Sequence, residues 1–146
     1  MAVTFTNNWK NILDKLESVI ESEFKGALHV YKGNNIPKGV SQAIQLIPTG
    51  SDLLDFNATS ETREFSITVR FVSSQGGNLS ETSLDHILRY ISRIEALIHD
   101  NISMTLADNT SVHNCRFEST ELDSTQDTGV YTTEWVWKCS HQGNFA

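Results

Sequence analysis

The chain has 146 residues and a formal net charge of −7 at pH 7, a length typical of one domain, here residues 1–146. The acidic balance argues against a surface that grips nucleic acid through clustered Lys and Arg, and against docking on anionic lipid. No apolar run approaches the roughly 18 residues of a membrane-spanning helix. Met1–Thr6 lacks the basic and apolar regions of a signal peptide. We therefore expect an intracellular protein with no membrane partner.

Residues 7–24 have the hydrophobic spacing of an amphipathic helix. Apolar side chains recur at steps of three and four, which places them on one helix face. They are Trp9, Ile12, Leu13, Leu16, Val19, Ile20 and Phe24. Thr6 or Asn7 is a suitable N-cap, and Gly26 is expected to end the helix because glycine tolerates the left-handed cap conformation.

Three strands are predicted between this helix and the next. Ala27–Tyr31 and Gln42–Ile47 are short candidates, and Pro48 is expected to close the second one. Arg63–Val72 is the clearest strand, because apolar and polar residues alternate along it. The intervening Thr49–Thr62 is polar and is predicted to be a long loop, a kind of segment that is often functional.

The second half of the chain is predicted to contain a helix followed by a β-hairpin. Ser83–His99 carries an apolar stripe, and Thr82–Asp85 resembles a capping box. Ile102–Leu106 is a short strand candidate. Val112–Leu122 and Val130–Ser140 are the strands of the hairpin.

The hairpin predicts a sheet with one apolar face. If it is centred near Asp127, then Cys115 faces Cys139 and Phe117 faces Trp137. The core face would hold Cys115, Phe117, Tyr131, Trp135, Trp137 and Cys139. The exposed face would hold Thr132, Glu134, Val136 and Lys138. An apolar Val136 on that face hints at partial cover by a partner.

The element order α-β-β-β-α-β-β predicts an α+β fold. Strands that follow one another in sequence usually pair antiparallel. We therefore expect a two-layer domain in which two helices cover one face of an antiparallel sheet.

No residue pattern for catalysis, cofactor binding or a metal is found. The five histidines, His29, His86, His99, His113 and His141, have no H-x-x-x-H or H-E-x-x-H partner, and each is interpreted as surface or structural. Carboxylate pairs such as Asp52 and Asp55 lack an apolar setting that would tune their pKa. We predict no enzymatic activity, cofactor or metal. The two cysteines are expected to be core thiols in a reducing cytosol, with a disulfide as the alternative.

The chain resembles the tail-terminator (tail-completion) proteins of long-tailed bacteriophages. The resemblance runs over nearly the whole chain, through Trp9–Phe24, Arg63–Phe71, Leu84–Ile98 and Glu134–Lys138. It implies a subunit of a hexameric ring that caps the tail tube and joins the tail to the head connector or neck proteins. DNA would pass through the ring's channel without specific binding. The protein would belong to the tail or neck of a virion assembled in the host cytoplasm.

A ring subunit needs contact surfaces, and polar loops are the best candidates for them. These segments are Thr49–Thr62, Ser73–Ser80, Asp123–Gly129 and the tail His141–Ala146. The interface residues predicted on and beside them are Asp52, Asp55, Asp123, Asp127, Glu134, Val136 and Phe145.

Two other functions fit the same residues. The chain could be another phage neck or head-completion adaptor. It could also be a small non-phage enzyme or ligand-binding domain, which would need a concave pocket with convergent polar groups. His29 and Tyr31 are the candidates for such a pocket.

Overall fold

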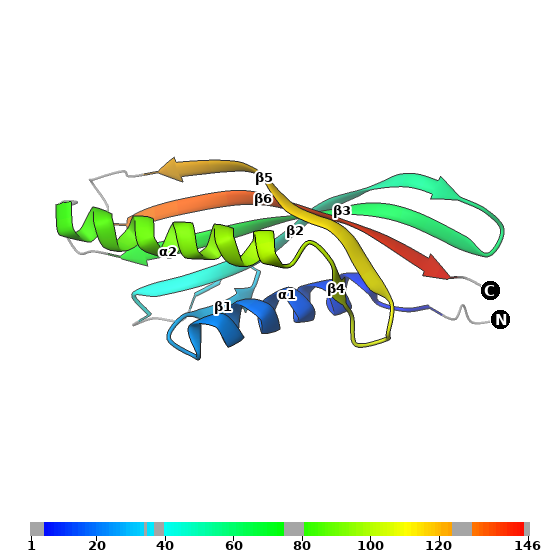
Figure 1. Cartoon of the computed structure of the whole chain (residues 1–146), viewed down its shortest axis with the longest axis horizontal. Helices are drawn as coiled ribbons and strands as arrows, with labels where there is room; N and C mark the ends of the chain where they lie inside the picture. Colours follow the sequence, from blue (N-terminus) through cyan, green and yellow to red (C-terminus); the bar gives the residue numbers. More distant parts are fainter. Residues whose placement is uncertain (1–4, 34, 37–39, 75–80, 124–129, 145–146) are drawn as a thin grey trace.

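A pair of antiparallel strands, β3 (Ser60–Ser74) and β6 (Val130–Asn144), forms the centre of the molecule (Figure 1). They belong to a computed structural model that describes residues 5–33, 35–36, 40–74, 81–123 and 130–144. Within those residues the strand order of the sheet is β1-β2-β3-β6-β5-β4. The other elements are α1 (Asn8–Phe24), β1 (His29–Lys32), β2 (Gln42–Phe56), α2 (Glu81–Asp100), β4 (Met104–Thr105) and β5 (Ser111–Asp123).

The alternation along β3 decides which face of the sheet becomes the core. Phe65, Ile67, Val69 and Phe71 are buried, whereas the residues between them are only half-buried. Both helices lie on this side of the sheet (Figure 1), and their apolar stripes join the same core. The predicted two-layer α+β arrangement, with two helices on one face, is confirmed.

The prediction that the whole sheet is antiparallel was wrong at one edge. β1 pairs parallel with β2, from His29 opposite Ala43 to Lys32 opposite Leu46. The other strand pairs are antiparallel. The rule that sequential strands pair antiparallel is a tendency, and here β2 starts beside the start of β1.

The predicted loop Thr49–Thr62 was also wrong. β2 continues through Pro48 to Phe56, and β3 already begins at Ser60. A proline is tolerated in a strand at a bulge or a free edge, and both conditions hold. The register shifts between Pro48 and Gly50, and the pairing of β1 with β2 ends at Leu46.

The helix ends differ in detail from the predictions. Asn7 is the N-cap of α1, and its side-chain oxygen accepts the backbone N–H of Lys10 at 3.1 Å. The left-handed cap residue is Lys25, with a φ of 52°, and Gly26 follows with a φ of 83°. α2 already includes Glu81, so Thr82–Asp85 lies inside the helix and is no capping box.

The β5–β6 hairpin has the predicted core face. Phe117 pairs with Trp137, as expected. A bulge between His113 and Arg116 places Cys139 opposite the bulged residues, beside Cys115. The predicted tail from His141 onward was wrong up to Asn144, because β6 continues to that residue and His141 is buried.

Cys115 and Cys139 are free thiols in the core. The thiol of Cys139 donates to Cys115, and this hydrogen bond raises the pKa of Cys139 and lowers the pKa of Cys115. Burial raises the pKa of Cys139 further. Both thiols are buried, so a reagent in solution does not reach them, and Cys139 in addition stays protonated.

We therefore predict that alkylating reagent labels the folded protein slowly and the unfolded protein at two sites, with no reductant present. Intact mass measured after reaction in denaturant checks this. Cys115→Ser should gain one label under the same conditions. Labelling that appears only after reduction would mean that the two sulfurs are bonded in solution.

The buried imidazole of His141 makes stability depend on pH. Its Nε2 lies 2.9 Å from the hydroxyl of Thr110, which donates to Asp108 at 2.6 Å. Burial lowers the pKa of His141 below its ordinary 6.5, and the nearby charge of Asp108 opposes this shift. The unfolded chain therefore takes up a proton before the folded one as pH falls.

The free energy of unfolding should consequently decrease as pH falls below about 6.5, the ordinary pKa of histidine. Urea titrations at pH 7.5 and pH 5.5 measure the difference. His141→Gln keeps a hydrogen-bonding side chain without a titrating group, and it should show a smaller loss between the two pH values. An equal loss in both proteins would show that other groups cause the pH dependence.

Candidate interaction surfaces

The β2–β3 hairpin extends beyond the two helices at one end of the molecule (Figure 1). We call its distal part, residues 49–62, the hairpin arm. Its turn is held by Asn57, whose side-chain oxygen accepts the backbone N–H groups of Thr59 and Ser60, each at 2.9 Å. The register shifts twice along the arm, between Pro48 and Gly50 and between Leu53 and Asp55. The arm is therefore an ordered hairpin with two irregularities.

The hairpin arm carries apolar side chains that its own chain does not cover. Leu53, Leu54 and Phe56 are exposed, and Phe56 keeps 69% of its surface accessible. Strand pairing places Leu53 opposite Arg63 and Phe56 opposite Glu61. Arg63 and Glu61 form an ion pair, so the two charges on this face neutralise one another.

The predicted interface residues Asp52 and Asp55 both lie on the hairpin arm. Asp52 is opposite Glu64 and Asp55 is opposite Thr62. By the alternation of β3, Glu64 and Thr62 lie on the sheet face away from the helices, and Leu53 and Phe56 pair with residues of the other face. The arm therefore has an acidic side and an apolar side.

A second apolar feature lies beside the base of the arm. Phe5 is 80% exposed and lines a hollow of about 480 Å³ together with Trp9, Arg63 and Phe65. The rings of Trp9 and Phe65 meet edge-to-face at 4.7 Å. α1 is thus anchored to the sheet where the arm begins.

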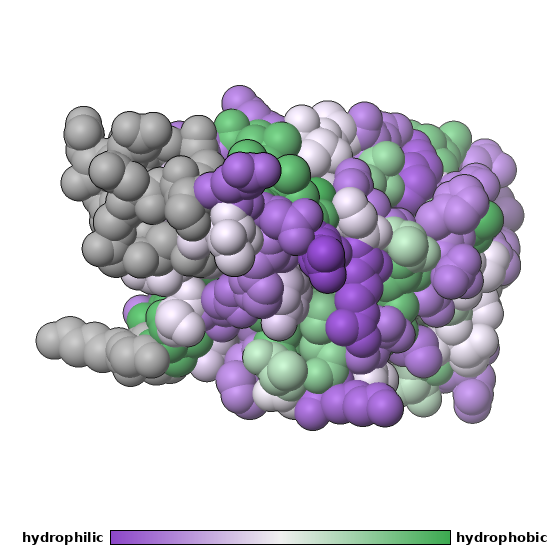
Figure 2. Space-filling view, turned by 60° about the vertical axis from the view of Figure 1, so that its left-hand side comes forward, coloured by the Kyte–Doolittle hydropathy of each residue, from purple (hydrophilic) through white to green (hydrophobic). Residues whose placement is uncertain are grey.

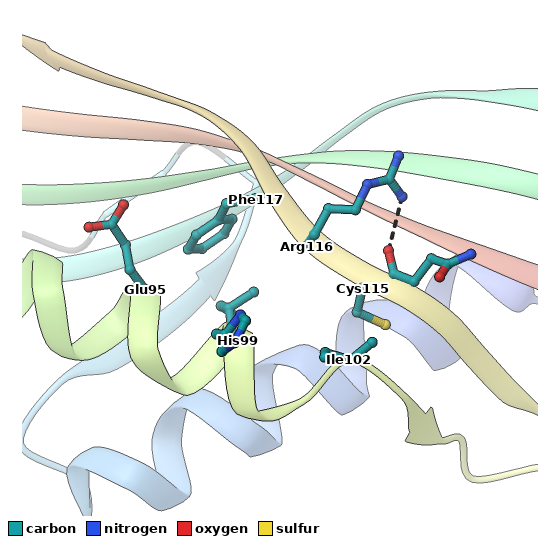
Figure 3. Close-up of a pocket in the computed structure, with 8 residues that line it drawn as sticks. Glu95, His99, Ile102, Cys115, Arg116 and Phe117 are labelled. Atoms are coloured by element: carbon teal, nitrogen blue, oxygen red, sulfur yellow. Dashed lines mark hydrogen bonds between the residues drawn. The ribbon is translucent and has the colours of Figure 1, made fainter.

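A groove runs between the C-terminal half of α2 and β5 (Figure 3). It has a volume of about 410 Å³, and Glu95, His99, Ile102, Cys115 and Phe117 are among its lining residues. Figure 3 shows the Glu95 side chain on α2 opposite the ring of Phe117 on β5. The Phe117 ring stacks on Trp135 at 4.9 Å and so forms a firm apolar wall.

Two charged groups of this groove, Glu95 and Arg116, have partners within the chain. The Glu95 carboxylate accepts the indole N–H of Trp135 at 3.4 Å and the hydroxyl of Thr120 at 3.2 Å. Arg116 leaves the groove and bonds to Glu64 and Glu118, at 3.1 and 2.7 Å. No group of three or more His, Cys, Asp or Glu in the described residues is placed to hold a metal ion.

β5 also presents an open strand edge. β4 pairs with it only at Ser111 and Val112, and the backbone N–H of Cys115 donates to Ile102 at 2.9 Å. In the described part of the chain, no strand pairs with the outer edge of residues 116–122. Such an edge is a template for a strand of another chain. The predicted interface residue Asp123 lies exposed at the end of this strand.

The sheet face away from the helices carries charged residues that form ion pairs. Arg70 donates to Glu134 at 2.6 Å, and Lys138 lies 3.1 Å from Glu118. Hydrogen bonds from Lys138 and, second, from Arg116 hold the pKa of Glu118 below its usual range. Glu134 and Val136, both predicted interface residues, lie on this face. Val136 is half-buried, so the chain itself already covers part of it.

The predicted interface residues that the structure describes therefore lie on several surfaces and not on a single one. Asp52 and Asp55 lie on the arm, Asp123 lies on the open edge, and Glu134 and Val136 lie on the uncovered sheet face. Asp127 and Phe145 fall outside the described residues, as do parts of the predicted loops 73–80 and 123–129. His29 and Tyr31 lie on β1, away from the residues that line the grooves described above.

Sequence reasoning missed the apolar residues of these surfaces. Leu53, Leu54 and Phe56 belong to Thr49–Thr62, the segment that was interpreted as a polar loop. Leu84 and Leu88 were counted in the apolar stripe of the second helix, yet both are exposed. Nothing in the spacing of the stripe shows that the sheet does not reach far enough to cover them.

Comparison with known proteins gives a fold and no family. No family model and no curated protein matches the sequence. Neither helix in the described residues combines the length and apolar character needed to cross a membrane. Among solved structures, the fold is similar to that of a chain from the "Virion of native gene transfer agent (GTA) particle", with a TM-score of 0.63 and 9% sequence identity. The likeness covers 95% of this chain and 100% of that chain. The two chains therefore share a fold over nearly their whole lengths.

Proposed function

We propose that this chain is a structural protein of a phage-like virion, and specifically the tail terminator. In this role six copies form a ring that caps the tail tube and offers a docking surface to the head connector or neck. The observation that carries the proposal is the shared fold with a chain of a gene transfer agent virion over the whole of that chain. Fold alone does not determine function, so the surfaces of the molecule provide the second support.

The surfaces described above suit a subunit that is in contact on several sides. The hairpin arm, the groove beside β5 and the open edge of β5 are distinct in shape, and the arm lies on other strands than the groove and the open edge. Unlike surfaces that meet head-to-tail close into a ring when the rotation between copies permits it. In the groove beside β5, Glu95 and Arg116 are already bonded within the chain, and the Cys115 thiol is buried. This supports a role in assembly rather than in catalysis.

The net charge suits a channel for DNA. Six copies of a chain with a charge of −7 carry −42. On the sheet face away from the helices, Arg70, Arg116 and Lys138 are all held in ion pairs with carboxylates. A ring with such surfaces would repel phosphates and let DNA pass without gripping it. No specific DNA binding is part of the proposed function.

The test is to mix the purified protein with the tail-tube protein of the same virus. We expect hexamers by native mass spectrometry or light scattering, and rings at the ends of tubes by electron microscopy. Tube growth should stop when the protein is added during polymerisation. DNA added to the same protein at physiological salt should give no shift in electrophoretic mobility.

The outcome separates the tail terminator from the other virion roles. Binding to the portal or connector without binding to tubes would identify a neck or head-completion adaptor instead. A chain that stays monomeric both alone and with tube protein would contradict the ring. The measurement with tube protein is needed because a ring subunit can stay monomeric in solution and assemble only on the tube, which serves as its template.

A further inference from the structure

The exposed large hydrophobic residues of the described chain fall into two groups on different surfaces. Phe5, Leu53, Leu54 and Phe56 lie on or beside the hairpin arm, and Leu84, Leu88, Ile102 and Leu122 lie on or next to α2 and β5. Scattered single apolar residues need no explanation, whereas gathered ones mark contact sites. Figure 2 views the molecule with the left-hand side of Figure 1 brought forward, and green hydrophobic patches interrupt the purple surface there.

The second group continues the groove of Figure 3 along the helix. Glu95 and His99 line that groove. Leu84 and Leu88 precede them by eleven residues each, which is about three helical turns, so they lie on the same helix face. Leu84 and Leu88 also line a hollow of about 470 Å³ near the start of α2. The helix therefore presents one continuous face with a polar half and an apolar half.

β5 forms the other wall of this longer groove. Thr120 reaches Glu95 across it at 3.2 Å. Leu122 follows two residues later and lies on the same side of the strand, because side chains alternate along a strand. Leu122 is 57% exposed, and it belongs to the segment with the open backbone edge. The groove thus offers apolar side chains and free backbone groups together; we call it the α2–β5 groove.

The hairpin arm also combines exposed apolar side chains with an open strand edge, but it protrudes from the molecule. Among the described residues, no strand pairs with the outer edge of β2 beyond Leu46, where the pairing with β1 ends. Leu53 and Phe56 lie on one side of it, and Asp52 and Asp55 pair with residues of the other face. The arm lies at one end of the molecule and the start of α2 lies at the other (Figure 1). A chain cannot place its own arm in its own groove across that distance.

We propose that the hairpin arm of one copy docks in the α2–β5 groove of the next copy. A protrusion and a groove are not self-complementary, so a two-fold dimer would leave one of them uncovered. A head-to-tail contact covers both, and it leaves each copy with one donor and one acceptor surface. The inference rests on the proposed ring function, because it names the contact that joins neighbouring subunits.

The charges predict how this contact responds to salt. The copies repel one another because each carries −7, and both partners bring carboxylates near the contact, Asp52 and Asp55 on the arm and Glu95 in the groove. Apolar side chains and backbone hydrogen bonds would supply the attraction. Added salt screens the repulsion and leaves the apolar contact, so assembly should strengthen as salt rises from about 50 to 500 mM. An interface held by ion pairs would weaken.

Two charge-introducing variants test the contact. Phe56→Asp places a charge on the arm, and Leu88→Asp places one in the groove. Each should weaken self-assembly about tenfold or more, because an apolar contact would have to bury an unpaired carboxylate. Both side chains are exposed in the monomer, so circular dichroism and thermal midpoint should be nearly unchanged. Ala96→Asp adds the same charge to the same helix, about 100° around its axis from Glu95, and should assemble normally.

Mixing the two variants gives the decisive result. The arm variant keeps an intact groove and the groove variant keeps an intact arm. An equimolar mixture should therefore form a one-to-one heterodimer and nothing larger, as measured by native mass spectrometry, while each variant alone stays monomeric.

Other outcomes overturn the proposal in distinguishable ways. Variants that still form rings would show that the contact lies elsewhere, and the capping of tubes would be unaffected. A mixture that yields no heterodimer would show that arm and groove do not bind one another. A wild-type chain that remains monomeric alone and on tubes would overturn the contact together with the ring.

Discussion

The mismatch in length between strands and helices governs the shape of this protein. β2, β3 and β6 have fifteen residues each, which is roughly 50 Å of extended chain at about 3.3 Å per residue. α1 and α2 have 17 and 20 residues, or roughly 26 and 30 Å at 1.5 Å per residue. Two helices of this length cannot cover the full sheet. The helices are also offset along the strands, so the hairpin arm extends beyond the helices at one end and the start of α2 extends beyond the strands at the other (Figure 1).

The parts of the fold that could be predicted are those where burial imposes a period. Phe65, Ile67, Val69 and Phe71 alternate because they pack under two helices, and the stripe of α1 repeats because it covers them. The aromatic face of β6 follows the same rule, with Trp135 and Trp137 fully buried. Each of these segments was assigned correctly, because its pattern records the face that water does not reach.

The hairpin arm could not be predicted for the same reason. Leu53, Leu54 and Phe56 do not alternate cleanly, because the described chain buries neither side of the arm. Pro48 was interpreted as the end of a strand, although a bulge at a strand edge accommodates it. The parallel pairing of β1 could not be predicted from the order of segments either. It depends on where the chain returns to the sheet and not on the composition of the strand. Surfaces that bind other molecules carry patterns set by the partner, so a single chain records them poorly.

The assignment of a function depends on how these surfaces combine. A likeness of fold at 9% identity transfers no residue, and Asp127 and Phe145 lie outside the described chain. The arm, the groove and the open edge are nevertheless properties of this molecule. In the groove beside β5, Glu95 and Arg116 are bonded within the chain. What the described residues leave exposed are apolar side chains and strand edges.

The energetics of such a contact favour assembly of a closed ring over smaller species. Fully burying one exposed Leu or Phe side chain contributes about 1.5–3 kcal/mol. Leu53, Leu54 and Phe56 still expose 46%, 54% and 69% of their surface, so burying the remainder supplies roughly 3–5 kcal/mol. Association costs about 4–15 kcal/mol in lost freedom before any contact is counted. Backbone hydrogen bonds between the two strand edges would add to the apolar contact and hold a pair of copies together. An open chain of copies nevertheless has one contact fewer than it has subunits. The last subunit of a ring makes two contacts for a single association cost. A template that holds several subunits in place, as the end of a tube would, lowers the remaining cost and ties ring formation to the finished tube.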